Sequence, residues 1–243
     1  NSKIRIGFLS SDILSGHSIT YFLKTILSNY EKSKFEIILI LSNSKEDKFT
    51  NSLKNLVDKT INISKQNNVN AINQVRQLNL DILVDLMGYT STQRIELFKN
   101  RMAKKQIIWM GYCNTTGLKN MDYIISDPNL IDREEEKFYT EKVIYLPKIW
   151  NTHCGFDFER EENPPPMIEN NFITFGSFNN PSKINENVIM CWAKILKNFE
   201  NSKLIIKCPS DKHQLIRIKK SLKEKSILDS VIFHTSFDNK KDH

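Results

Sequence analysis

The amino-acid sequence predicts an α/β protein with parallel sheets, arranged as two units. Apolar, β-rich runs alternate with segments of helical periodicity, as in right-handed βαβ units. One run, KFEIILILS (34–42), is continuously apolar, as is typical of a parallel strand buried on both faces. The alternation stops near 151–171, where Pro164–Pro166 exclude a helix interior or a central strand, and it restarts at residue 172.

The first unit is predicted to contain most of the elements. Residues 18–29 carry apolar side chains at helical spacing, and 45–58 and 68–78 are predicted as further helices. The predicted strands cover 3–10, 34–42, 60–64, 80–90, 105–112 and 122–127. Ligands of such sheets bind beyond the carboxyl ends of the strands, so we examined the residues that follow each strand.

The second unit repeats the alternation over a shorter length. Strands are predicted at 172–178, 203–208 and 230–234, and helices at 185–199 and 211–225. We therefore expect a first domain at 1–150, a linker at 151–171, and the first part of a second, truncated domain at 172–243. Because the chain begins in a strand and stops in mid-element, we expect it to be a piece of a longer protein.

Composition excludes several classes of protein. The four cysteines lie far apart without CxxC spacing, which argues against a structural zinc site or a disulfide framework and favours reduced thiols in a cytoplasmic protein. No apolar run reaches the ~20 residues of a membrane span. The net charge of +7 comes mainly from lysine and favours anionic ligands, but no RNA-binding pattern accompanies it. We therefore expect neither a membrane nor a nucleic acid as partner.

The stretch FITFGSFNNPSKINEN (172–187) carries the first candidate site. Asn180 and Lys183 lie between a buried strand and a helix for which Asn185 is the predicted N-cap. Free backbone N–H groups and a lysine at this point could bind a phosphate. The alternative, which spacing alone favours, is a solvated turn with a surface lysine.

The second candidate lies in SSDILSGHSITYF (10–22). Asp12 and His17 follow the first strand, and an aspartate and a histidine can together accept a proton and polarise a hydroxyl. The alternative is a helix start capped by Ser18 or Gly16, with His17 simply exposed.

The third candidate joins GYTSTQR (88–94) and WMGYCNTTGL (109–118). Glycines at strand exits permit close approach of a ligand, and hydroxyls can bond to a sugar, although ordinary turns explain the same residues. The motifs GxGxxG, GxxxxGK[ST], HExxH and GxSxG are absent, which argues against a dehydrogenase, an NTPase, a zincin and a serine hydrolase.

Six stretches taken in order resemble one known family. They are RIGFLSSD…H, DILVDLMGYT, QIIWMGYCNTTGL…MDYIISD, YTEKVIYLP, FITFGSFNNPSKI and CWAKILKNFENSKLIIKC. Together they resemble the catalytic region of protein O-GlcNAc transferases and SPINDLY-like proteins, glycosyltransferase family 41. The resemblance implies a GT-B fold, with two Rossmann-like, doubly wound domains that bind a nucleotide sugar between them.

The resemblance also implies roles for individual residues. Asp12 and His17 match catalytic positions, with one extra residue between them in this chain, and Tyr89 and Gly111 match sugar-binding positions. The matches to nucleotide- and phosphate-binding positions are Asn180, Lys183, Lys240 and His243. The chain departs from the family where RPAPxQ reads RMAKKQ and GYPxT reads GYCNT.

The activity implied is inverting, metal-independent transfer of GlcNAc from UDP-GlcNAc to Ser/Thr hydroxyls of proteins, with no cofactor and no metal site. The implied partners are a nucleotide-sugar donor and a protein or peptide acceptor, with tetratricopeptide repeats upstream. Part of the nucleotide site is expected beyond His243, so the piece alone is expected to be inactive. Alternatives are O-fucosyl transfer from GDP-fucose, which the SPINDLY-like motifs favour, glucosyl transfer to Asn, and an inactive protein-binding module.

Overall fold

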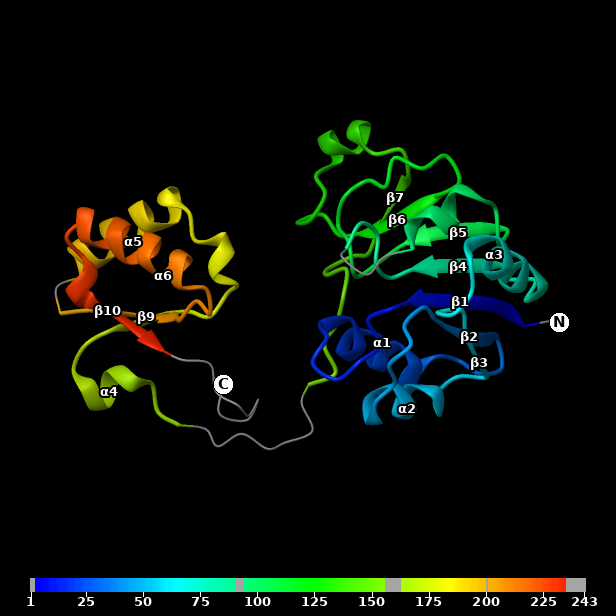
Figure 1. Cartoon of the computed structure of the whole chain (residues 1–243), viewed down its shortest axis with the longest axis horizontal. Helices are drawn as coiled ribbons and strands as arrows, with labels where there is room; N and C mark the ends of the chain where they lie inside the picture. Colours follow the sequence, from blue (N-terminus) through cyan, green and yellow to red (C-terminus); the bar gives the residue numbers. More distant parts are fainter. Residues whose placement is uncertain (1–2, 91–93, 156–162, 200, 235–243) are drawn as a thin grey trace. The chain divides into compact units, whose positions relative to one another are not determined.

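A computed structural model describes residues 3–90, 94–155, 163–199 and 201–234. The chain divides into two compact units, Asn1–Gly155 and Phe156–His243, drawn in Figure 1. We describe each unit separately.

The first unit is built on a seven-stranded sheet in which all neighbouring strands run parallel. The strands are β1 (Ile4–Ser10), β2 (Phe35–Leu41), β3 (Lys59–Asn62), β4 (Ile82–Asp85), β5 (Lys105–Ile108), β6 (Tyr123–Ser126) and β7 (Lys142–Tyr145). Their spatial order is β3-β2-β1-β4-β5-β6-β7. The alternation of strand and helix in the sequence dictates this arrangement, since parallel neighbours need a crossover connection.

Helices cover both faces of this sheet. Side chains of α1 (Ser18–Asn29) and α2 (Lys48–Lys54) pack in one core, while those of α3 (Asn68–Gln77) and the 3₁₀ helix η1 (Ile95–Lys99) pack in the other. Successive residues of a strand point to opposite faces, so Phe8 enters the first core and Leu9 the second. A second 3₁₀ helix, η2 (Arg133–Phe138), precedes β7.

The strand order reverses direction between β1 and β4, because the chain winds outward from β1 through β2 and β3 before crossing back to β4. In doubly wound sheets the loops diverge at such a point and leave a crevice beyond the carboxyl ends of the strands. The residues that follow Ser10 and Asp85 lie at this place.

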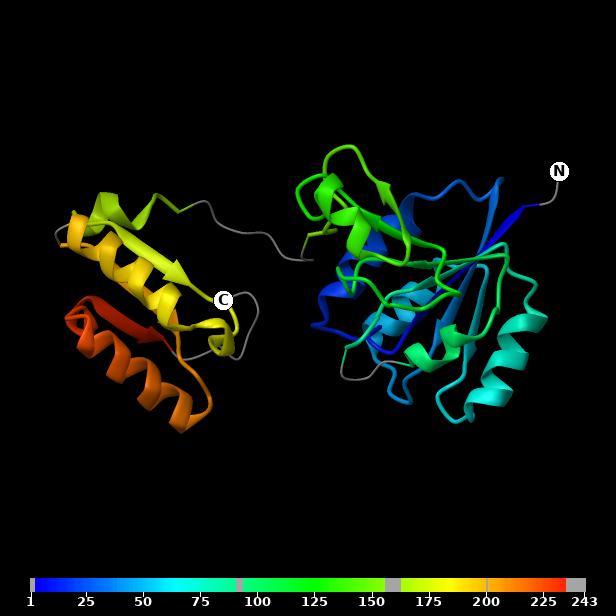
Figure 2. The same cartoon turned by 90° about the horizontal axis from the view of Figure 1, so that it is seen from above.

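The second unit has a three-stranded parallel sheet in the order β10-β9-β8. Its strands are β8 (Thr174–Ser177), β9 (Lys203–Lys207) and β10 (Val231–His234). The helices α5 (Glu186–Asn198) and α6 (Lys212–Glu224) lie side by side over one face of this sheet, as Figure 2 shows, and share one core with it. Short helices α4 (Pro166–Asn170), η3 (Pro181–Lys183) and η4 (Leu228–Ser230) complete the unit.

The predicted α/β class with parallel sheets is confirmed, and several predicted elements are shorter than expected. The predicted strand 80–90 ends at Asp85, whose carboxylate accepts the next backbone N–H groups and turns the chain. The predicted helix 45–58 is reduced to α2 because Asp47 caps it at Lys48. The segment predicted as a linker, 151–171, contains α4, which begins at Pro166, a position where proline is favoured.

Candidate functional site

Asp12 lies just beyond β1, at the reversal of strand order. Its backbone N–H donates to Ser10 Oγ at 2.9 Å, and its Oδ1 accepts from Ser11 Oγ at 3.0 Å. The side chain is only 12% exposed. These contacts hold the carboxylate at the carboxyl edge of the sheet.

His17 is the N-cap residue of α1, and its side chain makes no capping hydrogen bond. Instead its Nε2 lies 3.7 Å from Asp12 Oδ2. The imidazole is 45% exposed, so a ligand can reach it. The expectation that Ser18 or Gly16 caps this helix is wrong, because the chain enters the helix from an extended His17 and frees the imidazole for Asp12. The extra residue between Asp12 and His17 does not separate them.

Asp85 is a buried carboxyl group that the sequence reasoning missed. It closes β4, where Oδ1 accepts from the Met87 N–H and Oδ2 from the Gly88 N–H, both at 3.0 Å. Complete burial, with a smaller contribution from the charge of Asp12, raises the pKa of Asp85 from 3.8 to about 7, against the lowering effect of the two N–H groups. An acid at the end of an apolar run, as in ILVD, was the signal that could have revealed it.

The turn that Asp85 fixes carries Tyr89. The Tyr89 hydroxyl donates to the Thr116 carbonyl at 2.8 Å, and its ring packs edge-on against Tyr112, with centroids 5.7 Å apart. Tyr89 is nevertheless 48% exposed. One edge of the ring is therefore held in place while the other stays accessible to a ligand.

Glu141 organises the loop after β5. This buried carboxylate accepts from the Thr116 N–H and the Thr115 hydroxyl, each at 2.8 Å, and also from the Thr116 hydroxyl. The loop that meets Tyr89 is thereby anchored to the start of β7. Sequence reasoning noted the threonines but missed this carboxylate.

Gly111 lies where β5 and β4 exit together. A Cβ atom at this position would lie 1.7 Å from the Leu86 carbonyl oxygen, so the packing of two backbones requires glycine here. This requirement accounts for the glycine without a ligand. It also brings Gly111 and the Tyr89 turn into one layer at the carboxyl edge of the sheet.

In the second unit, Asn180 and Lys183 occupy one short turn. Asn180 Oδ1 accepts from the Ser182 N–H at 3.0 Å, and the Lys183 N–H donates to the Asn180 carbonyl at 3.0 Å. Both side chains are exposed. Asn185 is the N-cap of α5 and accepts from the Val188 N–H at 3.0 Å, as predicted. The amide of Asn180 is therefore engaged in the turn, whereas the ammonium group of Lys183 is presented to solvent.

The predicted residues fall into three local groups. Asp12 and His17 are in contact, Tyr89 and Gly111 share the β4 and β5 exits, and Asn180 and Lys183 share the turn before α5. Lys240 and His243 lie outside the described residues.

The described residues contain neither a metal-binding cluster nor a membrane-spanning helix. No group of three or more His, Cys, Asp or Glu side chains in the described ranges is placed to bind a metal. Among the helices of those same residues, none has the length and apolar content needed to cross a bilayer.

The fold is a doubly wound α/β fold with polar residues at the strand exits, and comparison with known proteins gives its class. The model of glycosyl transferase family 41 matches residues 1–154. This chain belongs to glycosyl transferase family 41.

The curated relatives extend the match into the second unit. The chain is 32% identical over 209 residues to a protein of Arabidopsis thaliana named "Probable UDP-N-acetylglucosamine--peptide N-acetylglucosaminyltransferase SPINDLY", covering 84% of this chain and 23% of that protein. A Caenorhabditis elegans protein named UDP-N-acetylglucosamine--peptide N-acetylglucosaminyltransferase is 31% identical over 60% of the chain and 13% of its own length. The chain thus spans about a quarter of the plant relative.

Solved structures confirm the GT-B fold. The chain resembles a Thermobaculum terrenum O-GlcNAc transferase mutant with a TM-score of 0.88 and 24% identity, covering 99% of this chain and 46% of that one. A lipopolysaccharide outer core galactosyltransferase, WaaB, matches with a TM-score of 0.57 and 12% identity over 97% of this chain and 69% of its own. At these identities the likeness concerns the fold alone.

Proposed function

We propose that this chain is part of the catalytic region of an inverting, metal-independent glycosyltransferase that moves GlcNAc from UDP-GlcNAc to Ser/Thr hydroxyls of proteins. The observation that carries the proposal is the Asp12–His17 pair, with Nε2 and Oδ2 3.7 Å apart, beyond β1 at the reversal of strand order. A part-buried carboxylate beside an accessible imidazole can orient a hydroxyl and accept its proton.

In this mechanism the acceptor oxygen attacks C1 of the sugar on the face opposite the nucleotide. The C1–oxygen bond to the diphosphate breaks, the acceptor proton passes to the Asp12–His17 pair, and UDP leaves with the bonding electrons. Lys183, exposed in the turn before α5, would neutralise the charge that develops on the diphosphate. Tyr89 and the Gly111 backbone would contact the sugar.

The two units take different roles in this proposal. Residues 1–150 form the acceptor and sugar side, and 172–243 form the first part of the nucleotide-binding side, with 151–171 connecting them. The full-length protein would supply the remaining nucleotide contacts and upstream tetratricopeptide repeats.

The experiment that tests the proposal uses the full-length protein. We expect the Asp12→Ala, His17→Ala double variant to lose transfer of radiolabelled sugar to a Ser/Thr peptide by about 100-fold or more in kcat. Donor affinity should change little, since the pair contacts the acceptor. Lys183→Ala should instead weaken donor binding. Normal turnover by the double variant would exclude the assigned role.

A second candidate keeps the fold and changes the donor to GDP-fucose. The six plant relatives named SPINDLY match at 30–33% identity, whereas the Arabidopsis thaliana relative named SEC matches at 26%. All seven names specify UDP-N-acetylglucosamine, so GDP-fucose is supported by the resemblance of the sequence motifs to the SPINDLY-like branch and not by these names. A thermal-shift panel of UDP- and GDP-sugars on the full-length protein separates the two donors. If none of the nucleotides binds, a non-catalytic protein-binding role replaces both candidates.

A further inference from the structure

A polar recess lies beside Asp12, on the side of β1 away from β4. Three consecutive strand exits line it. Ser11, Asp12 and Leu14 follow β1, residues 42–45 follow β2, and Ser64 follows β3. Its volume is about 390 Å³, within the range of small-ligand pockets. The lining is dominated by serine hydroxyls, with one amide, one carboxylate and one ammonium group.

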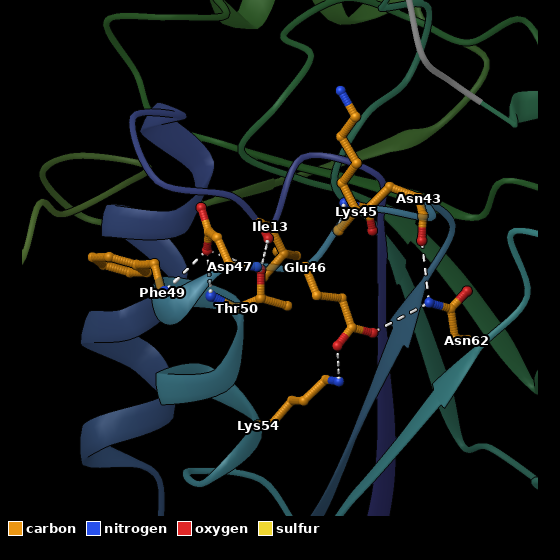
Figure 3. Close-up of polar contacts among 9 residues, drawn as sticks. All are labelled: Ile13, Asn43, Lys45, Glu46, Asp47, Phe49, Thr50, Lys54 and Asn62. Atoms are coloured by element: carbon orange, nitrogen blue, oxygen red, sulfur yellow. Dashed lines mark hydrogen bonds and ion pairs between the residues drawn. The ribbon is translucent and has the colours of Figure 1, made fainter.

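Hydrogen bonds between the loops make this recess rigid. Asp47 Oδ2 accepts from the Ser15 N–H at 2.6 Å, and Thr50 Oγ1 donates to the Ile13 carbonyl at 2.6 Å, so the second loop is fixed to the first (Figure 3). Asn62 Nδ2 donates to the Asn43 carbonyl at 3.1 Å and joins the second loop to the third. A ligand would therefore meet a preorganised surface, which lowers the entropic cost of binding.

The Lys45 ammonium group is not paired with either of the two acids that follow it, so it can bind an anionic ligand. The two acids that follow it are engaged elsewhere, since Glu46 pairs with Lys54 and Asp47 caps α2. Figure 3 shows the Lys45 ammonium group pointing away from both carboxylates. Among the described residues Lys45 forms no ion pair, and its side chain is exposed at the rim. An anionic group of a ligand can bind it without displacing a partner.

Asn43 has a side-chain oxygen that accepts no hydrogen bond among the described residues. Its Nδ2 donates to the Lys45 carbonyl at 2.7 Å, whereas its buried Oδ1 has no hydrogen-bond partner among the described residues. A buried carbonyl oxygen without a partner costs free energy, so a ligand N–H placed here would be favoured. A peptide backbone provides such an N–H group.

We propose that this recess is an acceptor subsite that selects peptides with a carboxylate side chain close to the modified Ser or Thr. The carboxylate pairs with Lys45, and a peptide N–H donates to Asn43 Oδ1. The acceptor hydroxyl then lies toward Asp12, the one residue that the recess shares with the proposed catalytic pair. A neutral sugar offers oxygen acceptors but no negative charge to pair with the ammonium group, so a peptide that carries a carboxylate fits the recess better than the donor hexose does. The proposal rests on the proposed function only for the direction of the hydroxyl.

The test measures binding rather than transfer. Two fluorescent peptides are compared, one with glutamates beside a single serine and one with glutamines in their place. Binding to the full-length protein is followed by anisotropy at neutral pH. We expect the Glu peptide to bind about three- to tenfold more tightly at low salt, with the difference shrinking at high salt.

Three variants locate the effect. Lys45→Gln should remove the preference for the Glu peptide, and Lys45→Arg should retain it. Lys59→Gln is the matched control, because Lys59 is exposed at the start of β3, at the opposite edge of the sheet. Equal binding of both peptides by the unmodified chain, or equal loss in the Lys59 and Lys45 variants, would overturn the proposal.

Donor binding is measured by thermal shift with UDP- and GDP-sugars on the full-length protein and its Lys45→Gln variant, because the proposed function requires nucleotide contacts from the full-length protein. A Glu preference that depends on Lys45 without any nucleotide binding would support the recess and count against the proposed transferase. Nucleotide binding that weakens in Lys45→Gln would assign the recess to the donor and refute the peptide subsite.

Discussion

Asp85 shows how a single buried carboxyl group can set the pH response of a site. Its two oxygens each accept one backbone N–H of the turn that carries Tyr89. Ser11 beside Asp12 also reaches this turn, because its N–H donates to Met87 Sδ at 2.9 Å. The protonation state of Asp85 is therefore coupled to the position of both the Tyr89 turn and the β1 exit.

We expect stability to fall as Asp85 ionises. Because burial raises its pKa to about 7, above the ordinary 3.8, its contribution is fully present below pH ~4 and is lost as the pH rises through 7. Between pH 5 and 8 the unfolding free energy should drop by about 1–3 kcal/mol from this group. Urea titrations of the unmodified chain and Asp85→Asn give the comparison.

The Asp85→Asn variant cannot ionise at this position, so this part of the pH dependence should disappear in it. Its amide offers one acceptor oxygen for two N–H groups, and we expect it to be less stable than the unmodified chain at pH 5. If the unfolding free energy of the two proteins changes with pH in the same way, the Asp85 carboxyl group is ionised over the whole range from about pH 5 to 8.

Gly111 gives a second prediction at the scale of one residue. Gly111→Ala should destabilise the first unit by about 3 kcal/mol or more, since the new methyl group would meet the Leu86 carbonyl oxygen. Gly117→Ala is the control, because a Cβ there meets no atom within 4 Å and adds only the strain of a φ of +67°. If thermal unfolding shows the same loss of stability in both variants, the close contact between Gly111 and the Leu86 carbonyl oxygen does not cause the loss.

At the scale of the element, α2 depends on one capping residue that also braces a loop. Asp47 accepts from the Phe49 and Thr50 N–H groups within the helix and from the Ser15 N–H outside it. Burial tends to raise the pKa of Asp47, but the backbone donors Thr50 and Ser15 outweigh it and lower the pKa from 3.8 to about 2.

We expect Asp47→Ala to lower the unfolding free energy by about 1–2 kcal/mol at pH 7. Because the pKa is lowered, this stabilisation is present above pH ~4 and is lost as the pH falls through 2. The unfolding free energies of the unmodified chain and of Asp47→Ala should therefore become equal in acid. Asp211→Ala removes the matching cap of α6 and is the control, since within the described residues the Asp211 carboxylate accepts only from the Gln214 N–H of its own helix. Only Asp47→Ala should also weaken binding of the Glu peptide.

The sequence predicted elements best where periodicity and capping agree. The helix after Asn185 is predicted at 185–199 and begins at Glu186, with Asn185 as its cap. The strand predicted at 80–90 is too long, because periodicity does not reveal that Asp85 bonds to its own turn. The strand β7 was not predicted, since only Val143 of its four residues is buried and its sequence shows little apolar alternation.

The candidate site was predictable to a similar degree. Asp12 and His17 are found from residue type, position after a strand and family resemblance, but their 3.7 Å contact depends on how the intervening loop folds. The recess lined by Lys45 was not predicted. It combines three loops that are separate in the sequence, at residues 11–14, 42–45 and 64, and only the strand order β3-β2-β1 brings them together.

At the scale of the whole molecule, the two units differ in the size of their cores. Within the described residues, the first unit has two clusters of 21 and 12 buried hydrophobic residues, and the second has one cluster of 9. A smaller core stabilises its unit less against the conformational entropy of the chain. We therefore expect the second unit to unfold first.

Trp192 in the second unit reports on this step once Trp109 and Trp150 of the first unit are replaced by phenylalanine. In urea, Trp192 fluorescence should change at a lower midpoint than the far-ultraviolet circular dichroism, which the larger unit dominates. Coincident transitions would show that the two units unfold as one cooperative body.

The loop between β1 and α1 has a consequence for how relatives of this chain are found. One residue more than the family spacing separates Asp12 from His17, and their side chains still meet. The neighbouring strands keep their pairing, so the longer loop leaves the sheet undisturbed. A search pattern that demands a fixed interval between an acid and a histidine would therefore discard family members such as this chain, whereas one anchored on the strand before and the helix after would retain them.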